Sequence, residues 1–219
     1  MDSATRVLLV RHGETAWNVD SRIQGQLDVG LNERGRWQAV RLAQAVADEP
    51  LDAIYASPLS RAFATAEAVA GGRGLAVVPD PALMERHFGD FQGMTFVEIE
   101  QRWPDLALRW RQRDPDFGPA GGETLAAFYG RSVAAVGAIA ARHRGQSIAV
   151  VAHGGVLDCL YRAAARLDLQ ATRTWRLGNA SINRLLHSDE GFSLVGWDDE
   201  RHLAEAPRDE IDDRVGPAA

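Results

Sequence analysis

Two histidines of the sequence each follow directly after a short apolar segment. Arg11 and His12 come after the run Val7 to Val10, and His153 comes after the segment 146–152. Continuous apolar runs with β-branched residues are typical of strands buried on both faces of a parallel sheet. Ligands of such sheets bind beyond the carboxyl ends of the strands. We therefore expect both histidines to reach the same crevice.

An arginine and a glutamate are predicted to reach that crevice as well. Segment 51–56 has the pattern of a second strand, and Arg61 lies one turn into the helix that follows it. Segment 75–80 has the pattern of a third strand, which leads on to Glu85. Each residue alone has an ordinary structural explanation. Unpaired charges at several buried strand ends, however, are costly and need a partner.

An anionic ligand would provide that partner. The guanidinium groups of Arg11 and Arg61 offer forked donors matched to phosphoryl oxygens, and helix N-termini add backbone N–H groups. Repulsion from the two arginines would keep His12 neutral, and a neutral imidazole is a nucleophile. The pattern therefore favours phosphoryl chemistry.

Helices are predicted between the strands. Asn32 is the expected N-cap of the first, and Ser57 and Pro58 are the expected N-cap and first residue of the second. The predicted helices cover residues 33–49, 58–70, 123–142 and 155–167, and the segments 180–188 and 192–198 are expected to close the sheet as a strand pair. Alternating strands and helices predict an α/β fold: a three-layer α/β/α sandwich with a mainly parallel central sheet and helices on both faces.

The segment 88–122 differs from the rest, because aromatic residues alternate there with arginines. We interpret it as a cap inserted into a single domain of residues 1–207, followed by a flexible tail at 208–219. Its aromatics are expected to pack against one another rather than to contact a ligand. Arg111 and Arg113 either bind a second anionic group of the substrate or belong to a solvated helix face, and the sequence leaves both interpretations open.

Composition narrows the function classes. The chain has 219 residues, 46% of them hydrophobic and 25% charged, and no apolar run approaches bilayer length. The N-terminus lacks the apolar core of a secretory signal. The net charge of −6 argues against nucleic acid or an anionic membrane face as partner, while a small anionic substrate remains compatible.

The single Cys159 is expected to be a buried thiol in a reducing, cytoplasmic setting. The oligomeric state stays open, with a homodimer as one option.

Four motifs in order resemble those of the histidine phosphatase superfamily, also called phosphoglycerate mutase-like. They are "RHGET" with Trp17-Asn18, "SPLSRAFATAE", "MER" and "VAHGG", and the resemblance extends to about Trp197. It implies a phosphoglycerate mutase-like α/β fold that needs neither metal nor other cofactor.

The resemblance also implies roles for residues. His12 would be phosphorylated in a covalent intermediate, Arg11, Arg61 and His153 would hold the phosphoryl group, and Glu85 would be the proton donor. Secondary phosphate contacts would come from Asn18, Gln24 and the amide of Gly154. The substrate would be a small phosphorylated metabolite.

Two other classes of function share part of this residue pattern. Two histidines and a carboxylate are also the ligand set of an iron or zinc site. Arg11 and Arg61 argue against a cation, because unit charges about 4 Å apart repel by roughly 4 kcal/mol at an effective dielectric near 20. A non-catalytic module that binds phosphorylated ligands is disfavoured because the nucleophile and the acid are both present.

A cofactor-dependent phosphoglycerate mutase is the closer alternative. The stretch "ERHFGDFQGM" resembles the mutase segment after its catalytic glutamate. Thr95 and Phe96, however, occupy the region of a mutase lysine, and Gln112 separates Arg111 from Arg113 where mutases have adjacent arginines. The stretch "GMTFVEIEQRWP" resembles the broad-specificity phosphatase branch instead. We therefore expect a phosphatase that hydrolyses small phosphate monoesters.

Overall fold

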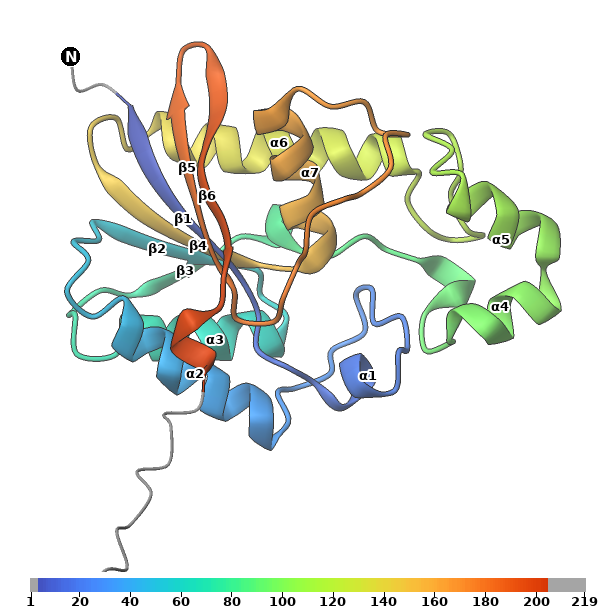
Figure 1. Ribbon diagram of the computed structural model, residues 1–219, viewed down its shortest axis with the longest axis horizontal. Helices are drawn as coiled ribbons and strands as arrows, with labels where there is room; N and C mark the ends of the chain where they lie inside the picture. The colour runs from blue at the N-terminus through green and yellow to red at the C-terminus, as the bar shows by residue number, and fades with distance from the viewer. Residues whose placement is uncertain (1–3, 205–219) are drawn as a thin grey trace, which may run out of the picture.

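A six-stranded sheet forms the centre of the molecule, in the order β3-β2-β4-β1-β5-β6 (Figure 1). The structure, a computed structural model, describes residues 4–204. The strands are β1 (Thr5–Arg11), β2 (Ala53–Ala56), β3 (Val77–Pro79), β4 (Ser147–Ala152), β5 (Ile182–Ser188) and β6 (Gly191–Asp199). Strands β3, β2, β4 and β1 are parallel, whereas β5 and β6 form an antiparallel hairpin beside β1. The mainly parallel sheet and the closing strand pair are confirmed.

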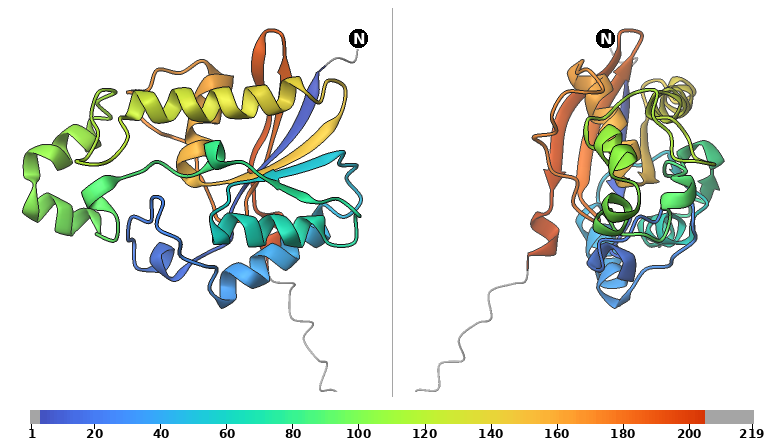
Figure 2. Two further views of the ribbon diagram at one scale, coloured as in Figure 1. Left: turned by 180° about the vertical axis from the view of Figure 1, so that it is seen from behind. Right: turned by 90° about the vertical axis from the view of Figure 1, so that its right-hand side faces the viewer.

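Helices cover both faces of this sheet (Figures 1 and 2). The helices are α1 (Ala16–Val19), α2 (Glu33–Ala45), α3 (Ser60–Ala70), α4 (Phe96–Arg102), α5 (Pro104–Arg111), α6 (Leu125–Ala141) and α7 (Gly154–Ala165), with 3-10 turns at Pro81–Leu83, Gly89–Phe91 and Arg201–Leu203. Helices α2 and α3 pack on one face, and α6 and α7 pack on the other. The expected three-layer α/β/α sandwich is confirmed.

Side chains of β1 alternate between the two layers because successive strand residues point to opposite faces. Val7 and Leu9 belong to the core under α6 and α7, and Leu8 and Val10 belong to the core over α2 and α3. Each is at most 4% exposed. Burial of such a side chain stabilises the fold by about 1.5–3 kcal/mol, so β1 is fixed in position up to its last residues.

Of the two predicted helix N-caps, one is confirmed and the other is wrong. Asn32 caps α2 as expected, its side chain accepting a hydrogen bond from Gly35 N at 2.7 Å. The expected Ser57 cap of α3 is wrong, because α3 begins at Ser60 after Leu59, which makes no side-chain cap. The Ser57 hydroxyl accepts a hydrogen bond from Leu59 N at 3.3 Å and lies 2.8 Å from Nε2 of His153.

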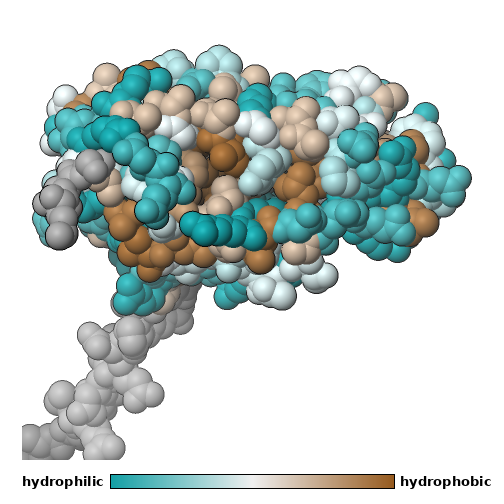
Figure 3. Space-filling model, turned by 90° about the horizontal axis from the view of Figure 1, so that it is seen from above, coloured by the Kyte–Doolittle hydropathy of each residue, from teal (hydrophilic) through white to brown (hydrophobic). Residues whose placement is uncertain are grey.

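The segment expected to form a cap lies at one end of the molecule, where α4 and α5 stand away from the sheet (Figures 1 and 2). It has a small core of its own, with Phe91, Ile99, Ala107 and Phe117 buried and further aromatics packed around them. Seen from above, its outer surface is mainly hydrophilic (Figure 3). The expectation that its aromatics pack against one another is confirmed. The division into one domain with a cap stays a prediction, and the expected tail at 208–219 lies outside the described residues.

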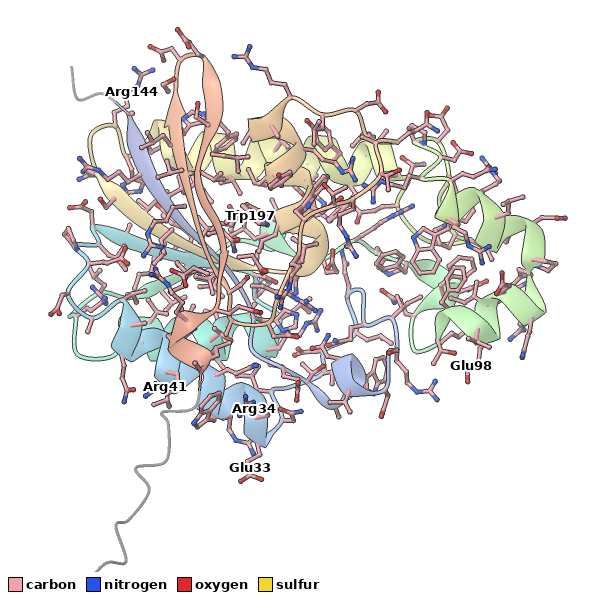
Figure 4. The ribbon with its side chains drawn as sticks, viewed as in Figure 1. Glu33, Arg34, Arg41, Glu98, Arg144 and Trp197 are labelled. Carbon is pink, nitrogen blue, oxygen red and sulfur yellow. The ribbon has the colours of Figure 1, made fainter. Side chains whose placement is uncertain are left out.

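Two side chains labelled in Figure 4 mark contacts between distant parts of the chain. Trp197 of β6 contacts Tyr161 of α7 edge to face, with ring centroids 4.8 Å apart. Glu98 of α4 pairs with Arg22, which follows α1, at 3.2 Å. The second contact joins the insert to the loop after β1, and that loop carries several of the expected site residues.

Within residues 4–204, no helix is long and apolar enough to cross a membrane. Cys159 is 2% exposed and unpaired, and burial raises the pKa of its thiol. The buried, inert thiol expected from the sequence is confirmed.

Candidate active site

His12 and His153 lie side by side at the carboxyl ends of β1 and β4. The two strands pair in parallel with Arg11 opposite Ala152, so the residues that follow are also neighbours. The backbone N–H of His12 donates to the Ala152 carbonyl at 3.0 Å. The two imidazole centroids are 5.1 Å apart, and the rings are tilted by 60°. The two histidines are neighbours, as expected, but only His12 borders a cavity, so the expectation that both reach the same crevice is confirmed for His12 alone.

The hydrogen bonding of His12 determines which ring nitrogen carries the proton. Nδ1 lies 2.7 Å from the carbonyl oxygen of Gly13, which can only accept a hydrogen bond. Nδ1 therefore carries the hydrogen, and Nε2 keeps its lone pair.

The pKa of His12 lies well below its usual value of 6.5 because the ring is buried and, to a smaller extent, because Arg11 and Arg61 repel the protonated form. The sequence suggested the second cause alone. Burial is the larger one.

Arg61, the second residue of α3, is 1% exposed. Its Nη1 donates to the Leu27 carbonyl at 2.9 Å and its Nη2 to the Gly25 carbonyl at 2.7 Å. Gly25 has a φ of +52°, a conformation that favours glycine. Burial lowers the pKa of Arg61 to about 10, so the guanidinium stays charged at neutral pH and holds the loop after β1 against the sheet.

Arg11 is half-buried, and its Nη1 donates to the carbonyl of Leu177 in the segment between α7 and β5. Its Nε and that of Arg61 are both buried with no hydrogen-bond partner among residues 4–204. Buried N–H groups of charged side chains without partners are costly. Such groups are suited to an anion that reaches them.

Asn18, in the short helix α1, and Gln24 both lie in the segment that follows β1. The Oδ1 of Asn18 accepts hydrogen bonds from the backbone N–H and the hydroxyl of Thr15, at 3.0 and 3.1 Å, and from Asn179 at 3.3 Å. These three contacts identify Oδ1 and leave the amide NH₂ of Asn18 as the group for a ligand. Gln24 is 8% exposed, and its Oε1 is buried with no partner in the described chain.

The carboxylate of Glu85 is held by two backbone N–H groups. Its Oε2 accepts from Gly155, in the first turn of α7, at 2.9 Å, and its Oε1 accepts from Arg86 at 2.8 Å. Each oxygen has a further lone pair for a proton. Glu85 is therefore fixed at the N-terminus of the helix that follows His153.

His153 is completely buried, whereas a side chain that contacts substrate directly would have some exposed surface in the free protein. Its Nε2 bonds to the Ser57 hydroxyl, and its Nδ1 has no partner within residues 4–204. The pKa of His153 is lowered by burial and then by its cationic and imidazole neighbours, of which His12 is the largest. The ring lies beneath the site, next to His12.

Two adjoining cavities surround these groups. A cavity of about 180 Å³ is lined by Arg11, His12, Asn18, Arg22, Ile23, Gln24, Gly25, Arg61, Glu85, Phe88 and Gly154. A larger cavity of about 630 Å³ shares Arg11, Glu85, Phe88 and Gly154 with it and extends between the insert and the segment after α7. Seven of the eight predicted site residues line the smaller cavity, and His153 is the exception.

Some residues at the site were missed by sequence reasoning. Ser57 follows β2 just as His12 and His153 follow their strands, and this shared position was the available signal. Asn179, whose Nδ2 donates to the His12 carbonyl at 3.0 Å, carried no such signal.

The remaining histidines lie away from both cavities. His87, His143, His187 and His202 line neither cavity. Arg111 pairs with Glu100 on the outer side of the insert. Arg113 does not lie on a solvated helix face, because it pairs with the buried Asp158 at 2.8 Å and lines the larger cavity.

Among residues 4–204 no three His, Cys, Asp or Glu side chains are grouped so that they could hold a metal ion. His12, His153 and Glu85, the set weighed as metal ligands, are not such a group. Their own contacts are with backbone groups and a hydroxyl.

Comparisons with known proteins agree with this geometry. The chain is 40% identical over 205 residues to "Phosphoglycerate mutase-like protein 4" of Arabidopsis thaliana, covering 91% of this chain and 87% of that protein. It is 38% identical over 204 residues to the "Metal-independent phosphoserine phosphatase" of the same plant, covering 91% and 84%.

A solved structure of a mycobacterial glucosyl-3-phosphoglycerate phosphatase complexed with VO3 superposes with a TM-score of 0.78 at 34% identity, over 88% of this chain and 98% of the other. The family model of the histidine phosphatase superfamily (branch 1) matches residues 7–200. Because its motifs lie at the strand ends and the family model matches nearly the whole chain, the protein belongs to the histidine phosphatase superfamily.

Proposed function

We propose that this protein is a phosphatase that hydrolyses small phosphate monoesters through a phosphohistidine formed on His12, without a metal ion. One observation carries the proposal: a neutral imidazole, with its lone pair on Nε2, borders a small cavity together with Arg11, Arg61 and the carboxylate of Glu85. The substrate is a small phosphorylated metabolite, in keeping with the phosphatase names of the relatives.

In the first step, Nε2 of His12 attacks the phosphorus atom. The N–P bond forms as the P–O bond to the alcohol breaks, and protonated Glu85 gives its proton to the departing oxygen. Glu85 is suited to this role because it borders both cavities, so it lies between the phosphoryl group and the rest of the substrate.

In the second step, water attacks the phosphohistidine. The carboxylate of Glu85 accepts a proton from that water, the N–P bond breaks, inorganic phosphate leaves, and Nε2 regains its lone pair. Glu85 is then protonated again, so protons and atoms balance over the cycle.

The phosphoryl group is stabilised by positive charge and by N–H donors. Arg11 and Arg61 supply the charge, the amide groups of Asn18, Gln24 and Gly154 add donors, and phosphoryl transfer asks a protein mainly for such positioning. His153 is assigned to the same group because its Nδ1 has no partner in the described chain and its ring lies 5.1 Å from that of His12.

The mutase alternative has less support at the positions where mutases bind the substrate carboxylate. Thr95 is the N-cap of α4, and Phe96 packs against Trp110 in the insert. Arg111 is paired with Glu100 on the outside. We also propose a cytoplasmic location, on the basis of the single buried thiol of Cys159.

The proposal is tested by trapping the intermediate. Wild-type protein and the His12→Ala variant are mixed with ³²P-labelled phosphate monoesters and quenched within milliseconds, and the label is located by mass spectrometry. We expect phosphorus on Nε2 of His12 in wild type and no turnover in the variant. The His187→Ala variant, changed at a histidine that borders neither cavity, serves as control.

Assays of the wild-type protein with different substrates separate the alternative functions. Robust conversion between 3- and 2-phosphoglycerate with a bisphosphoglycerate primer, together with negligible monoester hydrolysis, would favour the mutase. Binding of phosphorylated metabolites without any turnover would favour a non-catalytic module. Glu85→Gln should mainly slow alkyl phosphates, whose leaving groups need a proton, and should affect p-nitrophenyl phosphate less.

A further inference from the structure

The larger cavity adjoins the nucleophile and has room for more than a phosphoryl group. Its volume is about 630 Å³, against about 180 Å³ for the cavity at His12, and Arg11 and Glu85 form part of the wall of both. Cavities of several hundred Å³ accommodate whole small ligands. If the phosphoryl group occupies the smaller cavity, the alcohol part of the substrate extends into the larger one.

Five arginines line this larger cavity, and four of them are already engaged. Arg11 donates to a backbone carbonyl, Arg86 donates to the carbonyls of Phe117 and Glu123, and Arg176 pairs with Asp198 and Glu200. Arg113 pairs with Asp158. The fifth, Arg173, has an exposed side chain that makes no hydrogen bond, ion pair or ring contact with any residue of 4–204.

The acids of this cavity are engaged as well. Asp158 is shared by Arg113 and Arg162, at 2.8 and 3.0 Å, and Asp114 is bound by Arg109 at 2.7 Å. Glu85 is held by backbone N–H groups beside the nucleophile. No acid of the cavity wall is therefore left to neutralise Arg173.

The segment that carries Arg173 is anchored on both sides. The fully buried Arg162 donates to the carbonyls of Asp168 and Ala171, at 2.6 and 3.0 Å. Two residues after Arg173, the ring of Trp175 stacks on Tyr161 of α7, with centroids 4.0 Å apart. The backbone at 173 is thus held against α7 while the side chain remains available at the cavity.

The charge of Arg173 also acts on the phosphoryl-binding residues. Burial lowers the pKa of Arg11, and repulsion from Arg173 lowers it further. Two like charges near each other are unfavourable in the free protein. An anionic substrate that spans both cavities would relieve this repulsion.

We infer that Arg173 is a specificity-determining residue that binds a carboxylate carried on the alcohol part of the substrate. The inference rests on the phosphatase function proposed above. A guanidinium matches a carboxylate with two parallel hydrogen bonds. One free positive charge suits a monoanion better than a second phosphate, which carries close to two negative charges.

The test compares two substrates that differ only in this group. In 3-phosphoglycerate a carboxylate stands where glycerol 3-phosphate has a hydroxymethyl group. We expect wild-type protein to have the higher kcat/KM for 3-phosphoglycerate. The Arg173→Met variant, which keeps an unbranched side chain as far as the position of Nε and removes the guanidinium charge, should reduce that preference about tenfold or more, chiefly through KM.

Arg166→Met is the matched control. Arg166 is the C-cap of α7, seven residues before Arg173, and it is exposed and lines neither cavity, so its change alters the net charge equally. The substrate preference should then change less than twofold. Arg173→Lys should retain part of the preference, because it keeps the charge and loses the fork.

Other outcomes would overturn the inference. An unchanged preference in Arg173→Met, or equal losses for both substrates, would remove Arg173 as the carboxylate-binding residue. A stronger preference for propane-1,3-diol bisphosphate than for 3-phosphoglycerate would overturn the carboxylate assignment. Failure of wild type to hydrolyse p-nitrophenyl phosphate or either test substrate would instead count against the proposed function itself.

Discussion

The carboxylate of Glu85 and the backbone of Gly155 are in direct contact, although 70 positions separate them. The N–H of Gly155 donates to Oε2 at 2.9 Å. A Cβ atom at position 155 would lie 2.2 Å from Oε1 of Glu85 and 3.0 Å from a ring atom of Phe128. The position of the proposed proton donor therefore depends on a glycine.

Gly155→Ala should displace the Glu85 carboxylate. A misplacement of about 1 Å in a catalytic group costs on the order of 100-fold in rate, so we expect a loss of that size in kcat for alkyl phosphates. Esters of p-nitrophenol should lose less, because their leaving group needs no proton. Steady-state kinetics with both substrate types measure the difference.

The control for this prediction is Gly130→Ala in α6, where a Cβ would have no heavy atom within 4 Å. It should preserve activity and raise stability by up to about 1 kcal/mol, since alanine is the better helix former. If Gly155→Ala kept full activity on alkyl phosphates, Glu85 would not depend on this contact.

The pKa of His12 predicts how activity depends on pH. Because burial, Arg11 and Arg61 lower it, the nucleophilic neutral form persists below pH 6.5, the usual value. The acidic limb of kcat/KM that is due to His12 should thus lie below that pH. NMR titration of ¹⁵N-labelled imidazole measures the pKa directly.

Removal of a nearby charge should move this pKa in a known direction. Arg61→Met removes a group that disfavours the protonated ring, so the pKa of His12 should rise. Arg36→Met, on the exposed side of α2, should leave it unchanged. A His12 pKa at or above 6.5 in wild-type protein would contradict the description of a neutral nucleophile.

Ser57→Ala should destabilise the protein through His153. The Ser57 hydroxyl is the described partner of Nε2, at 2.8 Å, and both side chains are completely buried. A buried polar atom left without its partner costs about 1–3 kcal/mol, which urea denaturation detects. Ser193→Ala, at an exposed position of β6, is the control, and equal unfolding free energies for the two variants would show that the contact is not important.

Phe91→Ala should weaken the insert. Phe91 is 1% exposed and stacks on Trp103 with ring centroids 5.5 Å apart. Such a change costs about 3–5 kcal/mol, and hydrogen exchange should show lost protection in α4 and α5 while β1 and β4 remain protected. Val97→Ala on α4, where the side chain is 60% exposed, should stay within about 0.5 kcal/mol of wild type. Retained protection in Phe91→Ala would mean that the insert does not depend on this aromatic core.

The arrangement of layers could be predicted from the sequence because it depends on local patterns. The continuous apolar runs of β1 and β4 indicated parallel strands, and residues at the ends of parallel strands necessarily come together. This alone brought His12 near His153 and predicted a cavity with Arg11, Arg61 and Glu85. The family motifs then added Asn18, Gln24 and Gly154.

The chemical details of the site were decided by tertiary contacts between segments far apart in the chain. The predicted start of α3 was wrong: the helix begins at Ser60, and the hydroxyl of Ser57 contacts both Leu59 N and His153, which is 96 positions away. The burial that chiefly lowers the pKa of His12 depends on every element packed around it. Arg113 is likewise engaged by Asp158, 45 positions later in the chain.

The sequence by itself thus determined which residue types meet at the sheet edge, because strand order and side-chain alternation follow from short-range periodicity. Only the tertiary structure decided how deeply His12 is buried, which atoms a side chain at position 155 would meet and which arginine of the larger cavity is left for a ligand. Hydrogen bonds, steric contacts and desolvation act through space, so they depend on distances that a linear pattern does not contain.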